Sequence, residues 1–184
     1  MNIKEMNRHE IEKKLEGMGE YVQMDYLQRA LKSNIDFDTK KFVQIRLAKI
    51  YESRNMFLES AKLIKNSAEI NTTFKGKIED YMKSVELFIR AGSFEEADEV
   101  FKRALACGNV NEKNEIKKNL KTHYFNQALH YLKQDKRNQA KKTYERILTL
   151  ELSKDEKNDV QDKLLNLYNK LGFVREYRTL NNSR

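Results

Sequence analysis

A pattern of roughly 37 residues occurs several times along this chain. Three copies are clear: Leu47-Ala48-x2-Tyr51-x3-Asn55-x-Phe57-x2-Ser60, Tyr81-x6-Phe88-x3-Gly92-x-Phe94-x2-Ala97 and Tyr124-x3-Ala128-x2-Tyr131-x3-Asp135-x4-Ala140. Fainter copies include Met24 near the start and Tyr177 near the end. With Met24, Ser60, Ala97, Ala140 and Tyr177 as equivalent positions, the steps are 36, 37, 43 and 37 residues. Self-similarity at such a period indicates stacked structural repeats.

Each copy predicts two amphipathic helices joined by a tight turn. Phe94, Ala97, Phe101 and Ala104 recur at steps of three and four residues, which places them on one face of a helix. The small residue at the equivalent position allows a neighbouring helix to approach closely. The 184 residues include no proline and only six glycines, too little turn chemistry for a β-sandwich or barrel. The predicted fold class is therefore all-α.

Local signals define the predicted helix ends. Gly92 and Gly172 suit the left-handed residue that ends a first helix, and Gly108 the end of a second. Ser93 and Ser153, each followed three residues later by glutamate, predict capping boxes. The long third step predicts an extended loop around Cys107–Asn111. The expected helices are 4–17, 20–33, 39–53, 57–70, 73–91, 94–107, 112–134, 137–150, 154–171 and 173–180.

These residues resemble the tetratricopeptide repeat, as a divergent member that lacks the usual proline and has longer repeats. Other helical-hairpin solenoids, including the SNAP-like adaptors, fit the same pattern. The resemblance implies a right-handed α-solenoid of four to five antiparallel hairpins. It covers 1–184 as one domain, with units at about 4–33, 39–70, 73–107, 112–150 and 154–180. One hairpin cannot bury its apolar face alone, so stacking and a concave surface are expected on physical grounds as well.

The resemblance also implies that the first helix of each hairpin lines a concave groove that holds a partner helix or peptide. The implied groove residues are Phe42, Ile45, Lys49, Met82, Ile89, Arg90, Phe125, Leu129, Leu132 and Lys133. The apolar members would anchor the partner, while Lys49, Arg90 and Lys133 would steer acidic groups. An alternative is that several of these residues are ordinary packing between helices, displaced by one position in the register.

Positive charge is concentrated in the fourth hairpin. The chain carries a formal net charge of +8, and between Lys113 and Arg146 there are ten Lys and Arg against three acidic residues. A basic patch of Lys117, Lys118, Lys121, Lys141, Lys142 and Arg146 would attract nucleic acid or another anionic surface. A solvated helix face gives the same pattern. We treat this binding as the alternative to a non-catalytic scaffold or adaptor that binds another protein.

Signals for catalysis and cofactors are poor, and we expect neither an enzyme nor a bound cofactor. No phosphate-binding loop, nucleophile elbow or zinc-protease motif occurs. His123 and His130 lie about 10 Å apart on one predicted helix, too far to share a metal ion, so no metal site is expected. Cys107 has no cysteine partner and is expected to be a buried structural thiol.

The remaining expectations concern location and assembly. No apolar run approaches the roughly 20 residues that cross a bilayer, and the first residues lack a secretory signal. A cytoplasmic location without a membrane span is therefore expected. Val174, Tyr177 and Leu180 in the last helix are candidates for contact with a second copy, which would give a homodimer.

Overall fold

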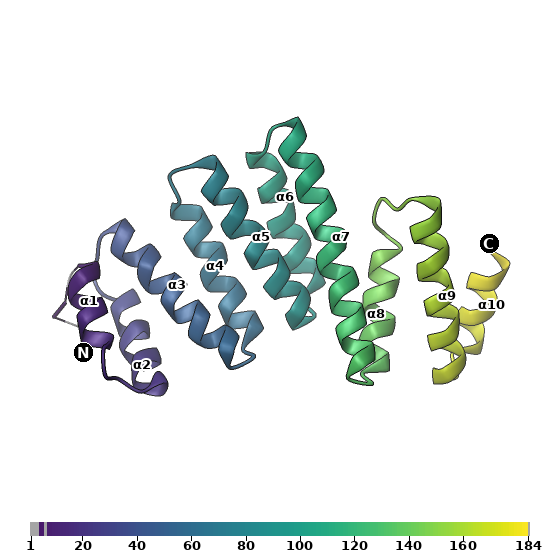
Figure 1. Cartoon of the computed structure of the whole chain (residues 1–184), viewed down its shortest axis with the longest axis horizontal. Coiled ribbons are helices and arrows are strands. Elements are labelled where there is room, and N and C mark those ends of the chain that lie inside the picture. Colours follow the sequence, from purple (N-terminus) through teal and green to yellow (C-terminus); the bar gives the residue numbers. More distant parts are fainter. Residues whose placement is uncertain (1–3, 6, 184) are drawn as a thin grey trace. The chain divides into compact units, whose positions relative to one another are not determined.

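The computed structural model describes residues 4–5 and 7–183, and these residues form ten α-helices (Figure 1). The helices are α1 (Arg8–Leu15), α2 (Glu20–Leu31), α3 (Phe37–Ser53), α4 (Phe57–Ile70), α5 (Phe74–Ala91), α6 (Phe94–Cys107), α7 (Val110–Lys133), α8 (Arg137–Ile147), α9 (Lys154–Leu171) and α10 (Val174–Asn182). The prediction of an all-helical chain is confirmed for this part of the sequence. Each expected range overlaps one helix, and no end differs by more than four residues.

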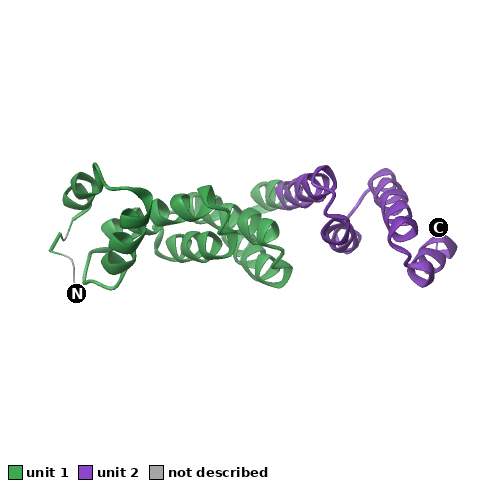
Figure 2. Ribbon diagram, turned by 90° about the horizontal axis from the view of Figure 1, so that it is seen from below, with its two compact units in different colours: residues 1–116 green, residues 117–184 purple. Residues whose placement is uncertain are grey.

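The helices form two compact units, and within each unit most helices pack on a neighbour in the chain (Figure 2). Unit 1 comprises residues 1–116, and unit 2 comprises residues 117–184. In unit 1, each helix from α2 to α5 packs on the next helix in the chain, and α1 contacts α3. In unit 2, α9 packs on both α8 and α10. The boundary between the units lies inside α7.

One backbone device closes four of the turns between helices. Asn55, Gly92, Asp135 and Gly172 have φ angles of 60°, 76°, 54° and 76°, in the left-handed region. The following amide then bonds a carbonyl five residues back, as from Ser93 N to Phe88 O at 3.0 Å. This bond pattern ends a helix in the Schellman motif. The predicted role of Gly92 and Gly172 is confirmed, and Asn55 and Asp135 perform it where glycine is absent.

Three local predictions around the sixth helix are wrong. Gly108 follows α6 in an extended conformation (φ −94°, ψ 148°), so it is not a left-handed cap. The Ser93 side chain makes no capping bond, because its residue lies in the tight turn (ψ 75°) and its amide already bonds Phe88. The Cys107 thiol is half-buried and not fully enclosed. The capping box at Ser153 and Glu156 is confirmed.

The expected long loop at Cys107–Asn111 is also wrong, because the extra residues of that repeat lie in a helix. Only Gly108 and Asn109 separate α6 from α7, and α7 has 24 residues where α5 and α9 have 18. Asn109 starts α7 through reciprocal bonds: Glu112 N to Asn109 Oδ1 at 3.0 Å, and Asn109 N to Glu112 Oε2 at 2.8 Å. This asparagine capping box ends the turn after two residues.

Small residues lie at the closest helix contacts, as the repeat predicts. Ser60, Ala97 and Ala140 are all fully buried, with 0% of each residue exposed. Apolar side chains of the same units are buried as well, such as Leu47 and Phe88 in unit 1 and Ile147 in unit 2. In unit 1, close packing at Ser60 and Ala97 holds α4 and α6 against the helices before them.

Among the described residues, no helix combines the length and apolar character that crossing a bilayer requires.

Candidate functional site

The three groove residues predicted on α3 lie together in an open groove between α1 and α3. Phe42 and Ile45 are half-buried at its floor, and Lys49 is exposed at its edge. The groove has a volume of about 440 Å³ and is also lined by Arg8, Glu12, Asp38, Lys41 and Arg46. The α3 residues are three or four positions apart, so they share one face of that helix.

Helix α1 forms the second wall of this groove. Its Arg8 and Glu12 are one turn apart and form an exposed ion pair, with 3.8 Å between Nε and Oε2. The Arg8 guanidinium also lies over the Phe42 ring, 4.9 Å from Cζ to the ring centre. This cation-π contact joins α1 to α3 across the groove.

The structure corrects the expected role of three groove residues on α5. Met82 and Ile89 are 7% and 0% exposed, so they pack inside unit 1 and offer no surface to a partner. Arg90 donates from Nη1 to Glu52 Oε1 at 2.7 Å and lies over the Phe57 ring at 4.0 Å. It is therefore occupied within the fold. The next residues along the helix, Lys83 and Arg90, are partly exposed. An error of one position in the predicted helix register is therefore enough to assign a buried residue to the surface.

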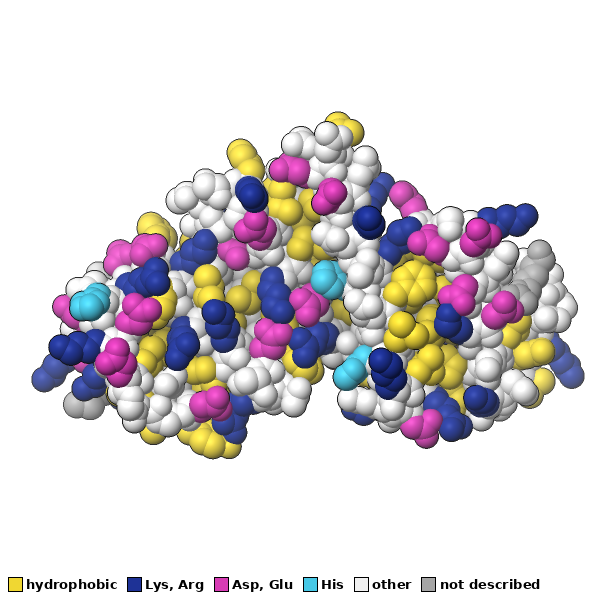
Figure 3. All heavy atoms as spheres, in the orientation of Figure 1, with side chains coloured by type: hydrophobic (Ala, Val, Ile, Leu, Met, Phe, Trp, Pro, Cys, Tyr) yellow, Lys and Arg dark blue, Asp and Glu magenta, His cyan; other side chains and the backbone are white. Residues whose placement is uncertain are grey.

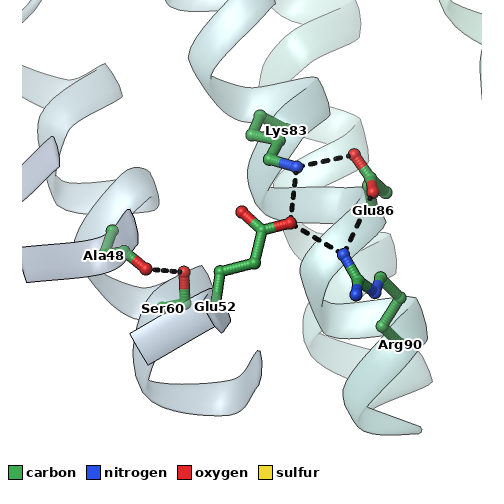
Figure 4. A network of polar contacts seen from close by, with 6 residues as sticks. All are labelled: Ala48, Glu52, Ser60, Lys83, Glu86 and Arg90. Atoms are coloured by element: carbon green, nitrogen blue, oxygen red, sulfur yellow. Dashed lines mark hydrogen bonds and ion pairs between the residues drawn. The ribbon is translucent and has the colours of Figure 1, made fainter. Parts of the chain in front are cut away.

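A polar network covers the surface where α3 and α5 meet (Figure 4). Glu52 of α3 accepts hydrogen bonds from Lys83 (3.0 Å to Nζ) and Arg90 of α5. Glu86 binds the same two cations at 3.1 Å and 3.6 Å. The apolar surface expected to run from α3 onto α5 is thus interrupted by charged side chains. In unit 1, an open apolar floor is found at the α1 and α3 groove.

Unit 2 carries a separate apolar strip on α7. Phe125 and Leu132 are half-buried, while Leu129 is 44% exposed and Lys133 is exposed. Phe125 lines a hollow of about 420 Å³ with Lys118, Lys121, Thr122, Asn126 and Glu156. Figure 3 shows apolar surface between charged side chains over this unit. The predicted α7 groove residues are therefore close together and partly accessible.

Three lysines of the predicted basic patch are engaged by carboxylates of the same unit. Lys117 pairs with Glu151 at 3.0 Å, and Lys121 pairs with Glu156 at 2.9 Å. Lys141 lies 3.5 Å from Glu145 and 4.2 Å from the centre of the Phe173 ring, and its side chain is only 14% exposed. Lys118 and Lys142 are exposed, and Arg146 is half-buried. Pairing lowers the positive potential that a phosphate backbone would encounter.

The histidines and the acidic residues do not converge on one site in the described part of the chain. His123 is half-buried and His130 is exposed, with the His130 ring 6.4 Å from that of Tyr131. No group of three or more His, Cys, Asp or Glu side chains there is arranged to hold a metal ion. Burial raises the pKa of Tyr144 to about 12, and its hydroxyl has no hydrogen-bond partner among the described residues. That shift reflects enclosure in the interior of unit 2.

One surface feature of unit 1 was not predicted from the sequence. Phe37, Phe74 and Val110 are each the first residue of a first helix, and they are 75%, 71% and 76% exposed. An apolar residue at the first position of three helices is a signal that the sequence itself contains. They lie outside the groove and provide exposed apolar residues for matched control variants.

No family model and no curated protein matches this chain. Among solved structures, the chain is similar to BtubC (BKLC) from P. vanneervenii, with 16% identity and a TM-score of 0.38. The match covers 94% of this chain and 76% of that one. A likeness of this strength establishes neither a shared fold nor a function.

Proposed function

We propose that this chain is a non-catalytic protein-binding module of the TPR-like α-solenoid type, which captures a helix or peptide segment of a partner protein. The observation that carries the proposal is the groove between α1 and α3. Its apolar floor, Phe42 and Ile45, is half-buried and surrounded by charged side chains, with the Arg8 guanidinium over the Phe42 ring. An apolar centre with a polar rim is the usual composition of a protein interface.

The size of the groove supports capture of a few side chains. Its volume of about 440 Å³ lies within the roughly 300–1,000 Å³ of most ligand sites. An apolar side chain that is fully removed from water there contributes about 1.5–3 kcal/mol. The groove would therefore supply the anchor of an interface, and contacts along the rim would supply its specificity.

The α7 strip of unit 2 would be a second contact region in this proposal. Phe125, Leu129 and Leu132 are spaced four and three residues apart, so they follow one face of the helix. Lys133 lies at the end of the strip, and Lys118 lies beside Phe125 in the hollow. A partner helix with matching apolar spacing would cover them.

A displayed peptide library selected on the full chain tests the proposal. Selected peptides should lose binding to a Phe42→Ala/Ile45→Asp chain, because that change removes the apolar floor. A Phe37→Ala/Phe74→Asp chain, altered at exposed aromatic residues outside the groove, should bind as the unaltered chain does. Circular dichroism of both variants shows whether the helices remain.

Two results would contradict the proposal. One is selection of no peptide at all. The other is a set of peptides that bind the folded groove variant, and also a Phe125→Asp/Leu129→Asp chain, as well as they bind the unaltered chain. In either case neither apolar region would be the site of capture.

A further inference from the structure

The charges around the α1 and α3 groove are not distributed evenly. The lining cations are Arg8, Lys41, Arg46 and Lys49, and the lining carboxylates are Glu12 and Asp38. Two of the cations are already compensated. Arg8 pairs with Glu12, and Lys41 Nζ lies 3.7 Å from Asp80 Oδ2 on α5.

The uncompensated charges lie at opposite ends of the groove. Within the described part of the chain, Arg46, Lys49 and Asp38 form no ion pair, and all three side chains are exposed. Asp38 is in the first turn of α3, eleven residues before Lys49, which corresponds to roughly 16 Å along the helix. The groove is therefore negative at one end and positive at the other.

The apolar floor lies between these two ends. Phe42 and Ile45 precede Arg46 and Lys49 by four residues each, so about 6 Å along α3 separates floor from cations. Side chains one turn apart on a partner helix are separated by the same distance. An apolar residue and an acidic residue at i and i+4, or i and i+3, would thus meet the floor and the cations together.

We infer that the groove takes an acidic amphipathic helix from another protein, seated with an apolar side chain on Phe42 and Ile45 and a carboxylate on Arg46 and Lys49. This inference rests on the function proposed above and names the chemistry of the partner at that site. Attraction between the partner's carboxylate and the cations Arg46 and Lys49 selects an acidic partner. It also fixes the direction of the partner helix, because the reversed orientation would bring that carboxylate toward Asp38.

The selected peptides provide the first test. Peptides whose capture requires Ile45 should carry Asp or Glu three or four positions from Leu, Ile, Met or Phe. This spacing should be more frequent among them than in the unselected library. Reversal of the cations, Arg46→Glu/Lys49→Glu, should weaken their binding by about tenfold, because two exposed attractions become repulsions. The matched control, Lys62→Glu/Lys102→Glu, makes the same charge change at exposed residues of α4 and α6 and should have little effect.

A charge swap provides the second test. Peptides in which Lys replaces the acidic residue should bind the Arg46→Glu/Lys49→Glu chain better than they bind the unaltered chain. Peptides that depend on Ile45 yet lack acidic enrichment, or that bind the reversed chain unchanged, would overturn this inference and leave the proposed function in place. Peptides that bind the folded Phe42→Ala/Ile45→Asp chain as well as the unaltered chain would also overturn this inference. They would overturn the proposed function as well only if they bind the Phe125→Asp/Leu129→Asp chain equally well.

Discussion

The Ser60 hydroxyl of α4 donates a hydrogen bond to the Ala48 carbonyl of α3, with 2.8 Å between the oxygens (Figure 4). Both residues are buried. The next contact repeats this arrangement, because Ser84 of α5 donates to the Ala61 carbonyl of α4 at 2.9 Å. In unit 1 a small residue thus permits close approach twice, and its hydroxyl then joins the two helices.

Two replacements of Ser60 distinguish the stabilisation from its hydrogen bond from the stabilisation that its small side chain allows. Ser60→Ala should lower the free energy of unfolding by about 0.5–1.5 kcal/mol, the value of one hydrogen bond. Ser60→Leu should cost more, because the longer side chain must displace α3 from a fully packed contact. Urea unfolding followed by circular dichroism measures both. Equal losses for the two variants would show that close approach at this position does not matter.

At the left-handed turn residues, the loss of unfolding free energy on substitution should depend on how well the new residue tolerates a positive φ. An added Cβ at Gly92 would meet no atom within 4 Å, so Gly92→Ala tests backbone conformation alone. It should cost about 1–2 kcal/mol, and Gly92→Asn should cost less because asparagine tolerates positive φ. Asn55→Gly should be neutral or stabilising. Thermal unfolding of the three variants checks this order, and a fully stable Gly92→Ala chain would contradict it.

The helices and their turns were predictable because their causes are local. Spacings of three and four residues mark the apolar faces, and Gly92 and Gly172 mark the turns within a few residues of the helices they end. The start of α7 was missed for a local reason as well. Asn109 and Glu112 form a capping box in which asparagine takes the place of the expected serine.

The groove was only partly predictable because its surface depends on long-range partners. Phe42, Ile45 and Lys49 line it, yet Met82 and Ile89 are buried and Arg90 is bound to Glu52, 38 residues away in sequence. Periodicity identifies the helix face toward the interior. It does not show where charged side chains of a later helix cover the surface, as Lys83 and Arg90 of α5 do at Glu52 of α3.

The capping box of α9 predicts an acid sensitivity of unit 2. Glu156 accepts hydrogen bonds from the Ser153 amide at 2.8 Å and from Lys121 at 2.9 Å, and these lower its pKa below the ordinary 4.5. A carboxylate with a lowered folded pKa stabilises the fold above its unfolded pKa and loses that contribution as the pH falls. The free energy of unfolding should therefore decline below about pH 4.5.

Glu156→Gln should reduce that decline, and Ser153→Ala should cost about 1 kcal/mol at neutral pH by removing the N-cap. Denaturant titrations from pH 7 to below pH 4.5 measure both effects. Asp155→Asn removes a neighbouring negative charge outside the capping box and serves as the control. An unchanged pH dependence in Glu156→Gln would assign the acid sensitivity to other groups.

The pairing of the basic patch predicts weak retention of nucleic acid. Lys117, Lys121 and Lys141 each hold a carboxylate, so few unpaired cations remain to release counterions from phosphates. Filter binding of RNA or DNA should be low at about 50 mM salt and absent at about 200 mM. Glu151→Gln/Glu156→Gln frees two lysines and should raise retention at low salt. Strong retention by the unaltered chain that Lys118→Glu/Lys142→Glu abolishes would instead favour an anionic ligand for unit 2.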